Sequence, residues 1–370
     1  MTGHDERTAL GLMSGTSLDG IDAALLRTDG RGRAQPGASA TRAYDAGLRD
    51  RLRASLGGRG DVMAVQRDVT MAHAEAVAAL LAEAGVAAEE VDVIGFHGHT
   101  IVHRPDQAIT WQIGDGALLA ERTGIDVICD LRSRDVAAGG QGAPLAPLYH
   151  AALASSLDRP LAVLNLGGVG NVTWLGEDGP GEDGPGEDAA ICAFDTGPGN
   201  ALVDDWVARH GGGRFDADGA LARAGTVHDD ILAGLLDNPY FDRPPPKSLD
   251  RDDFAGAVAA LDGLSAADGA ATLTAFTVGA VVSARDHLAE APRRWLVGGG
   301  GRHNPVLMAG LAAALGVPVE PVEAVGWDGD ALEAQAFAYL AVRALDGLAL
   351  SLPGTTGAPR PLTGGALHRH

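Results

Sequence analysis

Residues 11–25, GLMSGTSLDGIDAAL, have the pattern of two strands joined by a tight polar turn. An apolar run stops at the turn and then resumes as alternating apolar and small residues. Gly15 allows the backbone to reverse and lets a ligand approach it closely. Hydroxyl and backbone N–H groups crowd the turn at Ser14, Thr16 and Ser17. The stretch therefore suits the phosphates of a magnesium nucleotide.

Two carboxylates follow the turn and could hold the metal ion that accompanies such phosphates. They belong to Asp19 and Asp22, and magnesium prefers carboxylate oxygens among protein ligands. The alternative is an ordinary hairpin whose polar turn residues satisfy their own backbone. From this stretch alone, both interpretations stay open.

A second stretch of the same kind, LAVLNLGGVGNVTWL, covers residues 161–175. Gly167, Gly168 and Gly170 lie in its turn, between two apolar runs. Two strand–turn–strand units, about half a chain apart, indicate two related lobes that hold one phosphate chain between them. This plan is similar to that of actin-like ATPases, sugar kinases and Hsp70-like ATPases. We therefore expect an α/β fold of two ribonuclease-H-like lobes with a central nucleotide cleft.

Length and charge limit the classes of protein that fit the sequence. A chain of 370 residues suits two domains, and 46% hydrophobic residues suit a globular protein. The net charge of −21 argues against a nucleic-acid partner, because phosphate backbones need a basic surface. No apolar run reaches the length of a membrane span, and the N-terminus does not resemble a secretory signal. Cys129 and Cys192 fit buried thiols in a reducing compartment, so we expect a cytoplasmic protein without a membrane partner.

One lysine, Lys247, stands in a chain whose other basic residues are arginines and histidines. The alternative phosphate-binding loop, GxxxxGK[ST], is absent. Lys247 either performs chemistry for which arginine cannot substitute, or it remains by chance in a composition biased toward arginine.

Three parts of the chain are expected: an N-terminal lobe over residues 1–147, a C-terminal lobe over 148–346 and an irregular tail over 347–370. The spacing of apolar residues predicts a helix over Val62–Ala84 and a last amphipathic helix over Asp330–Leu345.

Four further turns follow expected strands: HGHT at 97–100, after a strand over Val91–Phe96, DLRSR at 130–134, DTGPGN at 195–200 and GGGG at 298–301. Ligands gather at the carboxyl ends of strands in open α/β sheets. Four such turns therefore favour an active cleft over ordinary loops.

Asp195 is the best candidate for a general base, because it ends the expected strand AICAF and glycines follow it. A helix N-cap is the alternative. Arg132 and Arg134 could clamp a carboxylate or a phosphate, or be solvated surface charges. The glycine run at 298–301, followed by Asn304, would let an adenine approach the backbone, unless it is a plain flexible loop.

Three histidines, His97, His99 and His103, also invite a zinc interpretation, as in metal-dependent amidohydrolases. Those enzymes need further His and Asp ligands at the ends of later barrel strands. The other histidines of this chain are mostly not placed there, which disfavours a zinc hydrolase.

Together these stretches closely resemble the anhydro-N-acetylmuramic acid kinases. The resemblance implies an ATP-dependent enzyme of cell-wall recycling, which opens the 1,6-anhydro bridge of anhydro-N-acetylmuramic acid with water and phosphorylates O6. The product would be N-acetylmuramic acid 6-phosphate. The matching stretches follow in family order over nearly the whole chain: MSGTSLDGID at 13–22, HGHTIVHRP at 97–105, TWQIGD at 110–115, TGIDVICDLRSRDVAAGGQGAPLAPLYH at 123–150, LNLGGVGNVT at 164–173, FDTGPGNALVDDW at 194–206, GGGGRHNPVLM at 298–308 and EAQAFAYLA at 333–341.

The resemblance also implies roles for single residues. Asp195 would activate the water, and the sugar would contact Thr100, Arg132 and Glu333. Asp19 and Asp22 are the expected magnesium ligands, and a homodimer is left open as the assembly. With the two turns and the glycine run, the expected ATP-binding residues are Gly15, Thr16, Ser17, Leu18, Asp19, Gly20, Ile21, Asp22, Gly167, Gly168, Gly299, Gly300 and Asn304.

Three features depart from the family pattern. His99 stands where the family usually has Gln, and KSLDR at 247–251 stands where the family has Lys followed by Ser-Thr-Gly-Arg. The acidic repeat GEDGPGEDGPGED at 176–188 looks like an insertion, for which we expect a flexible hairpin tip rather than a calcium loop.

Two other functions stay open from the sequence. One is another small-molecule kinase of the same superfamily, acting on a different sugar or a carboxylic acid. The other is an actin- or Hsp70-like ATPase, which would need polymer contacts or a peptide-binding domain.

Overall fold

A computed structural model describes residues 5–15, 18, 20–177, 190–249 and 253–370. This part of the chain forms two compact units. The first unit holds the described residues up to 157 and from 331 onward, and the second holds residues 158–177 and the described residues from 190 to 330.

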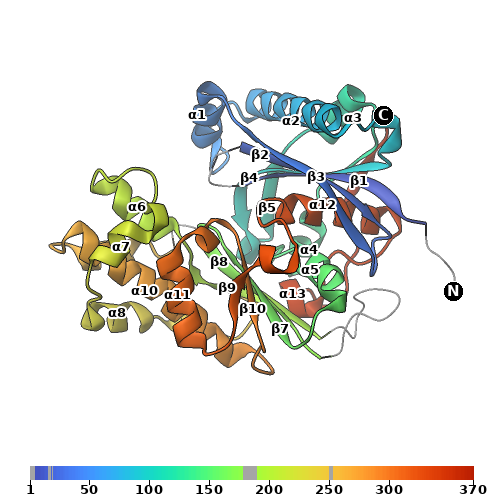
Figure 1. Ribbon diagram of the computed structural model, residues 1–370. Helices are drawn as coiled ribbons and strands as arrows, with labels where there is room; N and C mark the ends of the chain where they lie inside the picture. The colour runs from blue at the N-terminus through green and yellow to red at the C-terminus, as the bar shows by residue number, and fades with distance from the viewer. Residues whose placement is uncertain (1–4, 16–17, 19, 178–189, 250–252) are drawn as a thin grey trace. The chain divides into compact units, whose positions relative to one another are not determined.

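The first unit is built on a sheet in the order β12-β6-β4-β1-β2-β3, with β5 paired to β4 (Figure 1). The hairpin β1–β2 and the pair β2–β3 are antiparallel, whereas β4 is parallel to β1 and β6 is parallel to β4. The strands are β1 (Arg7–Ser14), β2 (Gly20–Thr28), β3 (Ala34–Ala43), β4 (Val93–Arg104), β5 (Ile109–Ile113), β6 (Val127–Cys129) and β12 (Ala366–His368).

Helices cover both faces of this sheet. Figure 1 shows α2 and α3 on one face and α12 on the other. The helices are α1 (Ala46–Ser55), α2 (Val62–Ala84), α3 (Gly116–Thr123), α4 (Ser133–Ala137), α5 (Pro147–Leu153), α12 (Leu332–Leu345) and α13 (Pro353–Thr356), with short 3-10 helices η1 (Ala88–Glu90), η2 (Pro105–Gln107) and η3 (Ala154–Ser156). The span predicted for the first long helix is confirmed, because α2 covers the same residues.

The helix α12 lies directly on the backbone of β1 and β4, because glycines leave room for it. A Cβ atom on Gly11 would lie 1.7 Å from the carbonyl oxygen of Ala334, and one on Gly95 would lie 2.0 Å from that of Phe337. The close approach fixes α12 in the first unit.

The second unit has a sheet in the order β11-β10-β7-β8-β9. The strands β7, β8 and β9 form an antiparallel meander, β10 is parallel to β7, and β11 is parallel to β10. The strands are β7 (Leu161–Leu166), β8 (Val169–Leu175), β9 (Ile191–Pro198), β10 (Trp295–Gly298) and β11 (Val319–Pro321).

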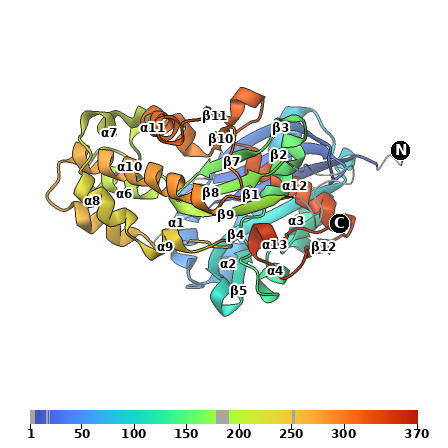
Figure 2. The ribbon, with the colours of Figure 1, turned by 90° about the horizontal axis from the view of Figure 1, so that it is seen from below.

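The core helix of the second unit is α10, with α6, α7, α8 and α11 around it (Figure 2). It is buried at Leu273, Phe276 and Ala280, among others. The helices are α6 (Ala201–Arg209), α7 (Ala220–Ala224), α8 (Asp229–Leu236), α9 (Pro239–Asp242), α10 (Ala266–Ala284) and α11 (Pro305–Leu315), with 3-10 helices η4 (Ala217–Gly219), η5 (Ala255–Leu261), η6 (Arg285–His287), η7 (Gly300–His303) and η8 (Val322–Val325).

One helical stretch of the described residues, Ala266–His287, is long and apolar enough to cross a membrane, with a mean hydropathy of 1.3. It comprises α10 and η6, and 56% of its most apolar window is buried inside the protein. Burial among the other helices of the second unit explains its apolar composition without a membrane.

The two sheets share one topology. In each, three antiparallel strands are followed by two parallel ones, and the order β6-β4-β1-β2-β3 matches β11-β10-β7-β8-β9. This is the strand order of ribonuclease H, so the prediction of two ribonuclease-H-like lobes is confirmed. The central nucleotide cleft stays a prediction.

The division of the chain differs from the expected boundaries of 147 and 346. Residues 148–157 and 331–346 lie in the first unit, the latter because α12 packs on Gly11 and Gly95. The tail over 347–370 also belongs to the first unit and contains regular structure, since β12 pairs with β6.

Two expected strands run further than their sequence suggests. The strand β4 continues through HGHT at 97–100 to Arg104, because β5 pairs with it there. Asp195 does not end its strand, because β9 continues to Pro198. Of the acidic repeat, residues 178–188 lie outside the described residues.

Candidate active site

The first turn joins β1 to β2 and keeps a strained backbone. Thr16, Ser17 and Asp19 lie outside the described residues. Leu18 has a φ of 61°, and its N–H donates to the carbonyl of Gly15 at 3.1 Å. A left-handed leucine is costly and is held only where its surroundings require it, which is common at ligand-binding turns.

Asp22 follows this turn as the third residue of β2, after Gly20 and Ile21, and is half-buried. Its Oδ1 accepts a hydrogen bond from the hydroxyl of Thr41 at 2.6 Å. Among the described residues, no group of three or more His, Cys, Asp or Glu side chains could hold a metal ion. Within the described residues, Asp22 is therefore not part of a preformed metal-binding cluster.

A buried chain of hydroxyl and imidazole groups stands behind the first turn. The Tyr44 hydroxyl donates to Ser14 Oγ at 2.7 Å, and Ser14 Oγ lies 2.9 Å from Nδ1 of His99. Burial lowers the pKa of His99 to about 4, so the ring is neutral at pH 7. The histidine at the family's usual glutamine position therefore contacts the turn.

Arg132, just before α4, is held in place by two bonds. Its Nε donates to His97 Nε2 at 3.1 Å, and its Nη1 donates to the carbonyl of Gly142 at 2.6 Å. Burial, together with the charge of Arg132, keeps the pKa of His97 well below its usual range. The guanidinium also lies 5.8 Å from the ring centre of Phe337 on α12.

The loop that receives Arg132 is fixed by Asp135, a buried residue that sequence reasoning missed. Its Oδ1 accepts from the backbone N–H of Gly142 at 2.6 Å, and its Oδ2 accepts from the hydroxyl of Thr356 at 2.6 Å. Thr356 lies 221 residues further along the chain, so no local pattern could reveal this contact.

Glu333 lies in the first turn of α12 and interacts electrostatically with two predicted site residues. Its pKa is raised by desolvation and by Asp22, against the lowering effect of the Arg132 charge. The side chain is nevertheless exposed, so water screens part of this shift. Thr100 on β4 accepts a hydrogen bond from the side chain of Gln112 at 3.2 Å. The charges of Arg132 and Asp22 thus both act on Glu333 within the first unit.

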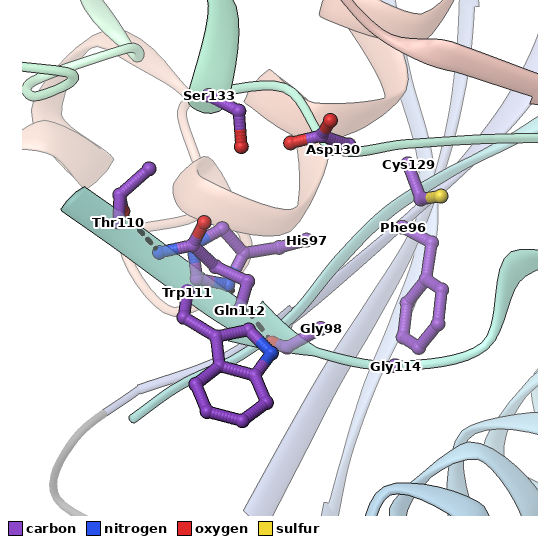
Figure 3. A pocket seen from close by; sticks show the side chains of 10 residues that line it. All are labelled: Phe96, His97, Gly98, Thr110, Trp111, Gln112, Gly114, Cys129, Asp130 and Ser133. Carbon is purple, nitrogen blue, oxygen red and sulfur yellow. Dashed lines mark hydrogen bonds between the residues drawn. The ribbon is translucent and has the colours of Figure 1, made fainter. Parts of the chain in front are cut away.

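A cavity of about 210 Å³ lies in the first unit, and His97, the hydrogen-bond partner of Arg132, is one of the residues that line it. Figure 3 shows Asp130 and Ser133 on one side of it and Trp111 and Gln112 on the other. Gln112 also donates to the hydroxyl of Thr110 at 2.8 Å. The cavity mixes aromatic faces with hydrogen-bonding groups, the composition that suits a small polar ligand such as a sugar.

The hydrogen bonds of His97 and His99 do not fit the zinc interpretation. His97 donates from Nδ1 to the carbonyl of Gly98 at 2.9 Å (Figure 3). Its Nε2 accepts from Nε of Arg132 at 3.1 Å. Both of its ring nitrogens are therefore engaged by the protein, while His99 contacts Ser14.

The second turn joins β7 to β8 and lies against the start of α6. The carbonyl of Gly167 accepts from Asn200 N at 2.7 Å, and that of Gly168 accepts from Gly199 N at 2.9 Å. The start of a helix carries a partial positive charge and unpaired N–H groups. Here the N–H of Ala201, the first residue of α6, already donates to the Gly168 carbonyl at 3.3 Å, so the partial positive charge of the helix start, rather than this N–H, favours an anion beside the turn.

Asp195 lies within β9, opposite Asn171 of β8. Its carboxylate Oδ2 accepts from the backbone N–H of Leu249 at 2.8 Å, and its own N–H donates to the carbonyl of Lys247 at 3.0 Å. The hydroxyl of Tyr240 donates to the backbone carbonyl of Asp195 at 2.6 Å. The alternative of a helix N-cap is wrong, since Asn200 holds that position before α6.

The glycine run after β10 makes a tight turn. Gly299 has a φ of 71°, and a Cβ there would lie 2.3 Å from Oδ1 of Asn165. Arg302 closes the turn by donating to the carbonyl of Gly299 at 2.9 Å. Asn304 caps α11, because its Oδ1 accepts from the N–H groups of the first helical residues. Gly300, which begins η7, belongs to the same turn.

Arg134, the other candidate clamp, lies on the surface. Its guanidinium donates to the hydroxyl of Thr363 at 2.6 Å. The structure therefore separates the two arginines, which sequence reasoning treated alike.

Two ribonuclease-H-like units, each with a glycine-containing turn between its first two strands, are characteristic of the actin-like ATPase fold. A family model described as "Anhydro-N-acetylmuramic acid kinase" matches residues 7–370, and the chain belongs to this family.

Curated relatives match at nearly full length. The anhydro-N-acetylmuramic acid kinase of Paramagnetospirillum magneticum is 58% identical over 97% of this chain and 99% of the relative. That of Rhodospirillum rubrum is 59% identical over 96% of this chain and 93% of the relative. Among solved structures, a ROK family glucokinase from Streptomyces griseus is 14% identical, with a TM-score of 0.42, over 90% of this chain and 99% of that one.

Proposed function

We propose that the chain is an ATP-dependent kinase that opens the 1,6-anhydro bridge of anhydro-N-acetylmuramic acid with water and phosphorylates O6. The product is N-acetylmuramic acid 6-phosphate, and the pathway is cell-wall recycling. The observation that carries this proposal is full-length membership of the kinase family, with relatives of that name 58% and 59% identical.

The substrate itself dictates the order of bond changes. In a 1,6-anhydro sugar, O6 is an ether oxygen and has no proton to lose. A phosphoryl group can stay on O6 only if the bond from O6 to C1 breaks. Water therefore forms a bond to C1, the O6–C1 electron pair attacks the γ-phosphorus, and ADP leaves with its electron pair.

Asp195 is the proposed base that takes the proton from the attacking water. The backbone N–H of Leu249 at 2.8 Å holds one carboxylate oxygen, which fixes the direction of the group. A base must be oriented before its basicity matters, and the surrounding contacts supply that orientation.

Arg132, Thr100 and Glu333 are the proposed sugar contacts. The lactyl group of the substrate carries a carboxylate, and a guanidinium recognises carboxylates by paired hydrogen bonds. His97 and the carbonyl of Gly142 orient Arg132 for this task.

ATP with magnesium is proposed to lie against the two turns. Gly167 and Gly168 beside α6 offer a positive helix end to the phosphates. Asp22, with Asp19 of the turn, would hold the magnesium ion, which offsets negative charge on the transferring phosphoryl group. Gly299 and Gly300 would face the adenine, whereas Asn304 already caps α11.

A cytoplasmic location and a homodimer belong to the same proposal. The fold and family leave little support for an actin- or Hsp70-like ATPase, whereas a kinase for another small molecule is the remaining alternative.

A screen of ATP consumption separates the candidates. The purified chain is given anhydro-N-acetylmuramic acid, its analogue without the lactyl group, and common hexoses. Consumption that depends on the anhydro sugar supports the proposal. Faster consumption with a hexose, or consumption without any sugar, contradicts it.

A further inference from the structure

The lysine that stands alone in the sequence is buried in the second unit. Lys247 is 3% exposed. Its Nζ donates to the backbone carbonyls of Tyr240 at 3.1 Å and Phe241 at 3.2 Å. It also lies 4.8 Å from the ring centre of Tyr240 and 5.5 Å from that of Phe194. The side chain thus bonds residues at both ends of one short segment, 240–247, to each other.

Residues of this segment and Leu249 also form hydrogen bonds with Asp195, the proposed base. Tyr240, at one end, donates its hydroxyl to the carbonyl of Asp195. Lys247, at the other end, accepts from the N–H of Asp195 at 3.0 Å, and Leu249 donates to its carboxylate. Tyr240 and Lys247, which bond to the backbone of Asp195 from the two ends of the segment, are therefore connected through the Nζ of Lys247.

Lysine fits this place better than arginine. A single nitrogen can reach two carbonyls between the rings of Tyr240 and Phe194, whereas a planar guanidinium needs more room and a forked acceptor. Burial and the charge of Arg243 lower the pKa of Lys247 to about 8, against the effect of Asp242. Protonated or neutral, the nitrogen keeps at least two N–H donors, enough for both carbonyls.

The third neighbour of the nitrogen is His287, whose Nε2 lies 3.1 Å from Nζ and 2.7 Å from the carbonyl of Phe241. The imidazole, which belongs to η6, therefore shares the carbonyl of Phe241 with Lys247 as a hydrogen-bond acceptor.

We propose that Lys247 is a positioning residue for the reaction: its nitrogen joins the segment 240–249 into one clamp that holds the carboxylate of Asp195. The inference rests on the proposed function, because it takes Asp195 as the base. It assigns Lys247 no contact with sugar or ATP.

Kinetics of Lys247→Met test this role, since methionine keeps the length and removes the donors. A displaced base lowers kcat, by about 10- to 100-fold, and leaves both KM values within twofold. The double variant with Asp195→Asn should be no slower than Asp195→Asn alone, because the two changes remove one function. The matched control is Arg209→Met, an exposed cation in the last turn of α6 and outside the 240–249 segment, which should keep the wild-type kcat.

Several outcomes would overturn the role of Lys247. These are a kcat of Lys247→Met within twofold of wild type, a raised KM at unchanged kcat, and additive losses in the double variant. If Asp195→Asn itself is active, the proposed base fails, which a separate assay of that variant reveals.

A spectroscopic test covers the case in which Lys247→Met does not fold. Lysine labelled with ¹³C at Cε gives one signal, because the chain has one lysine. The signal should move when Asp195 is changed to Asn and stay in place in Arg209→Met. An unchanged signal in Asp195→Asn would contradict the clamp.

Discussion

A single carboxylate, that of Asp195, carries the proton transfer in the proposed reaction. Its neighbours on the 240–249 segment orient it, and Arg132 in the first unit is oriented in the same way by His97 and Gly142. In both cases, hydrogen bonds to backbone groups or to an imidazole fix the orientation of a charged side chain.

Asp195→Asn should lower kcat by about 10²- to 10⁴-fold, because the shape is kept and the base is lost. ATP binding should stay nearly intact, as measured by calorimetry. The control is Asp237→Asn, an exposed aspartate after α8, which should match the wild type in both assays. Asp195→Asn activity within a few-fold of wild type would remove Asp195 from the mechanism.

Arg132→Ala should damage use of the lactyl-bearing sugar more than use of the same anhydro sugar without the lactyl group. A charge-assisted pair contributes about 1.5–3 kcal/mol, or roughly tenfold to a hundredfold in kcat/KM, only when a carboxylate is present. Arg134→Ala, on the surface, is the matched control. Equal losses on both sugars would place Arg132 on phosphate or in the scaffold.

At the scale of elements, sequence patterns predicted long periodic segments and both strand–turn–strand units correctly. They failed where polar residues lie inside strands, as at residues 97–100 and at Asp195, because pairing with a neighbouring strand overrides local composition. They also missed Asp135 and the contacts of Lys247, which depend on residues far along the chain or on burial. Only the rarity of lysine signalled Lys247.

The contact between β1 and α12 yields a prediction at this scale. Gly11→Ala should destabilise the protein by about 3 kcal/mol, because a Cβ there would lie 1.7 Å from a carbonyl oxygen of the helix. Gly32→Ala is the control, since a Cβ there meets nothing within 4 Å. Urea unfolding measures both, and equal stabilities of the two variants would contradict the close packing.

At the scale of the molecule, buried histidines are concentrated in the first unit. Burial lowers the pKa of His73, His99 and His150 to about 4, and that of His97 well below its usual range. The unfolded chain binds these protons near pH 6.5, whereas the folded unit does not. Stability contributed by the neutral rings is therefore complete above pH 6.5 and is lost as the pH falls toward 4.

We expect the free energy of unfolding to fall between pH 6.5 and 4, by up to about 1.4 kcal/mol per pH unit for each histidine. Hydrogen exchange measured at pH 7 and pH 5 should show the first unit losing protection before the second. A flat stability over this range, or earlier loss in the second unit, would contradict the assignment.

The central claim is that water opens the sugar at C1 while O6 takes the phosphoryl group, and isotope labelling tests it most directly. The reaction is run in ¹⁸O-water and quenched before the anomeric oxygen exchanges. The account predicts ¹⁸O at C1 of N-acetylmuramic acid 6-phosphate and none in its phosphate. Label in the phosphate, or an unlabelled C1, would contradict it.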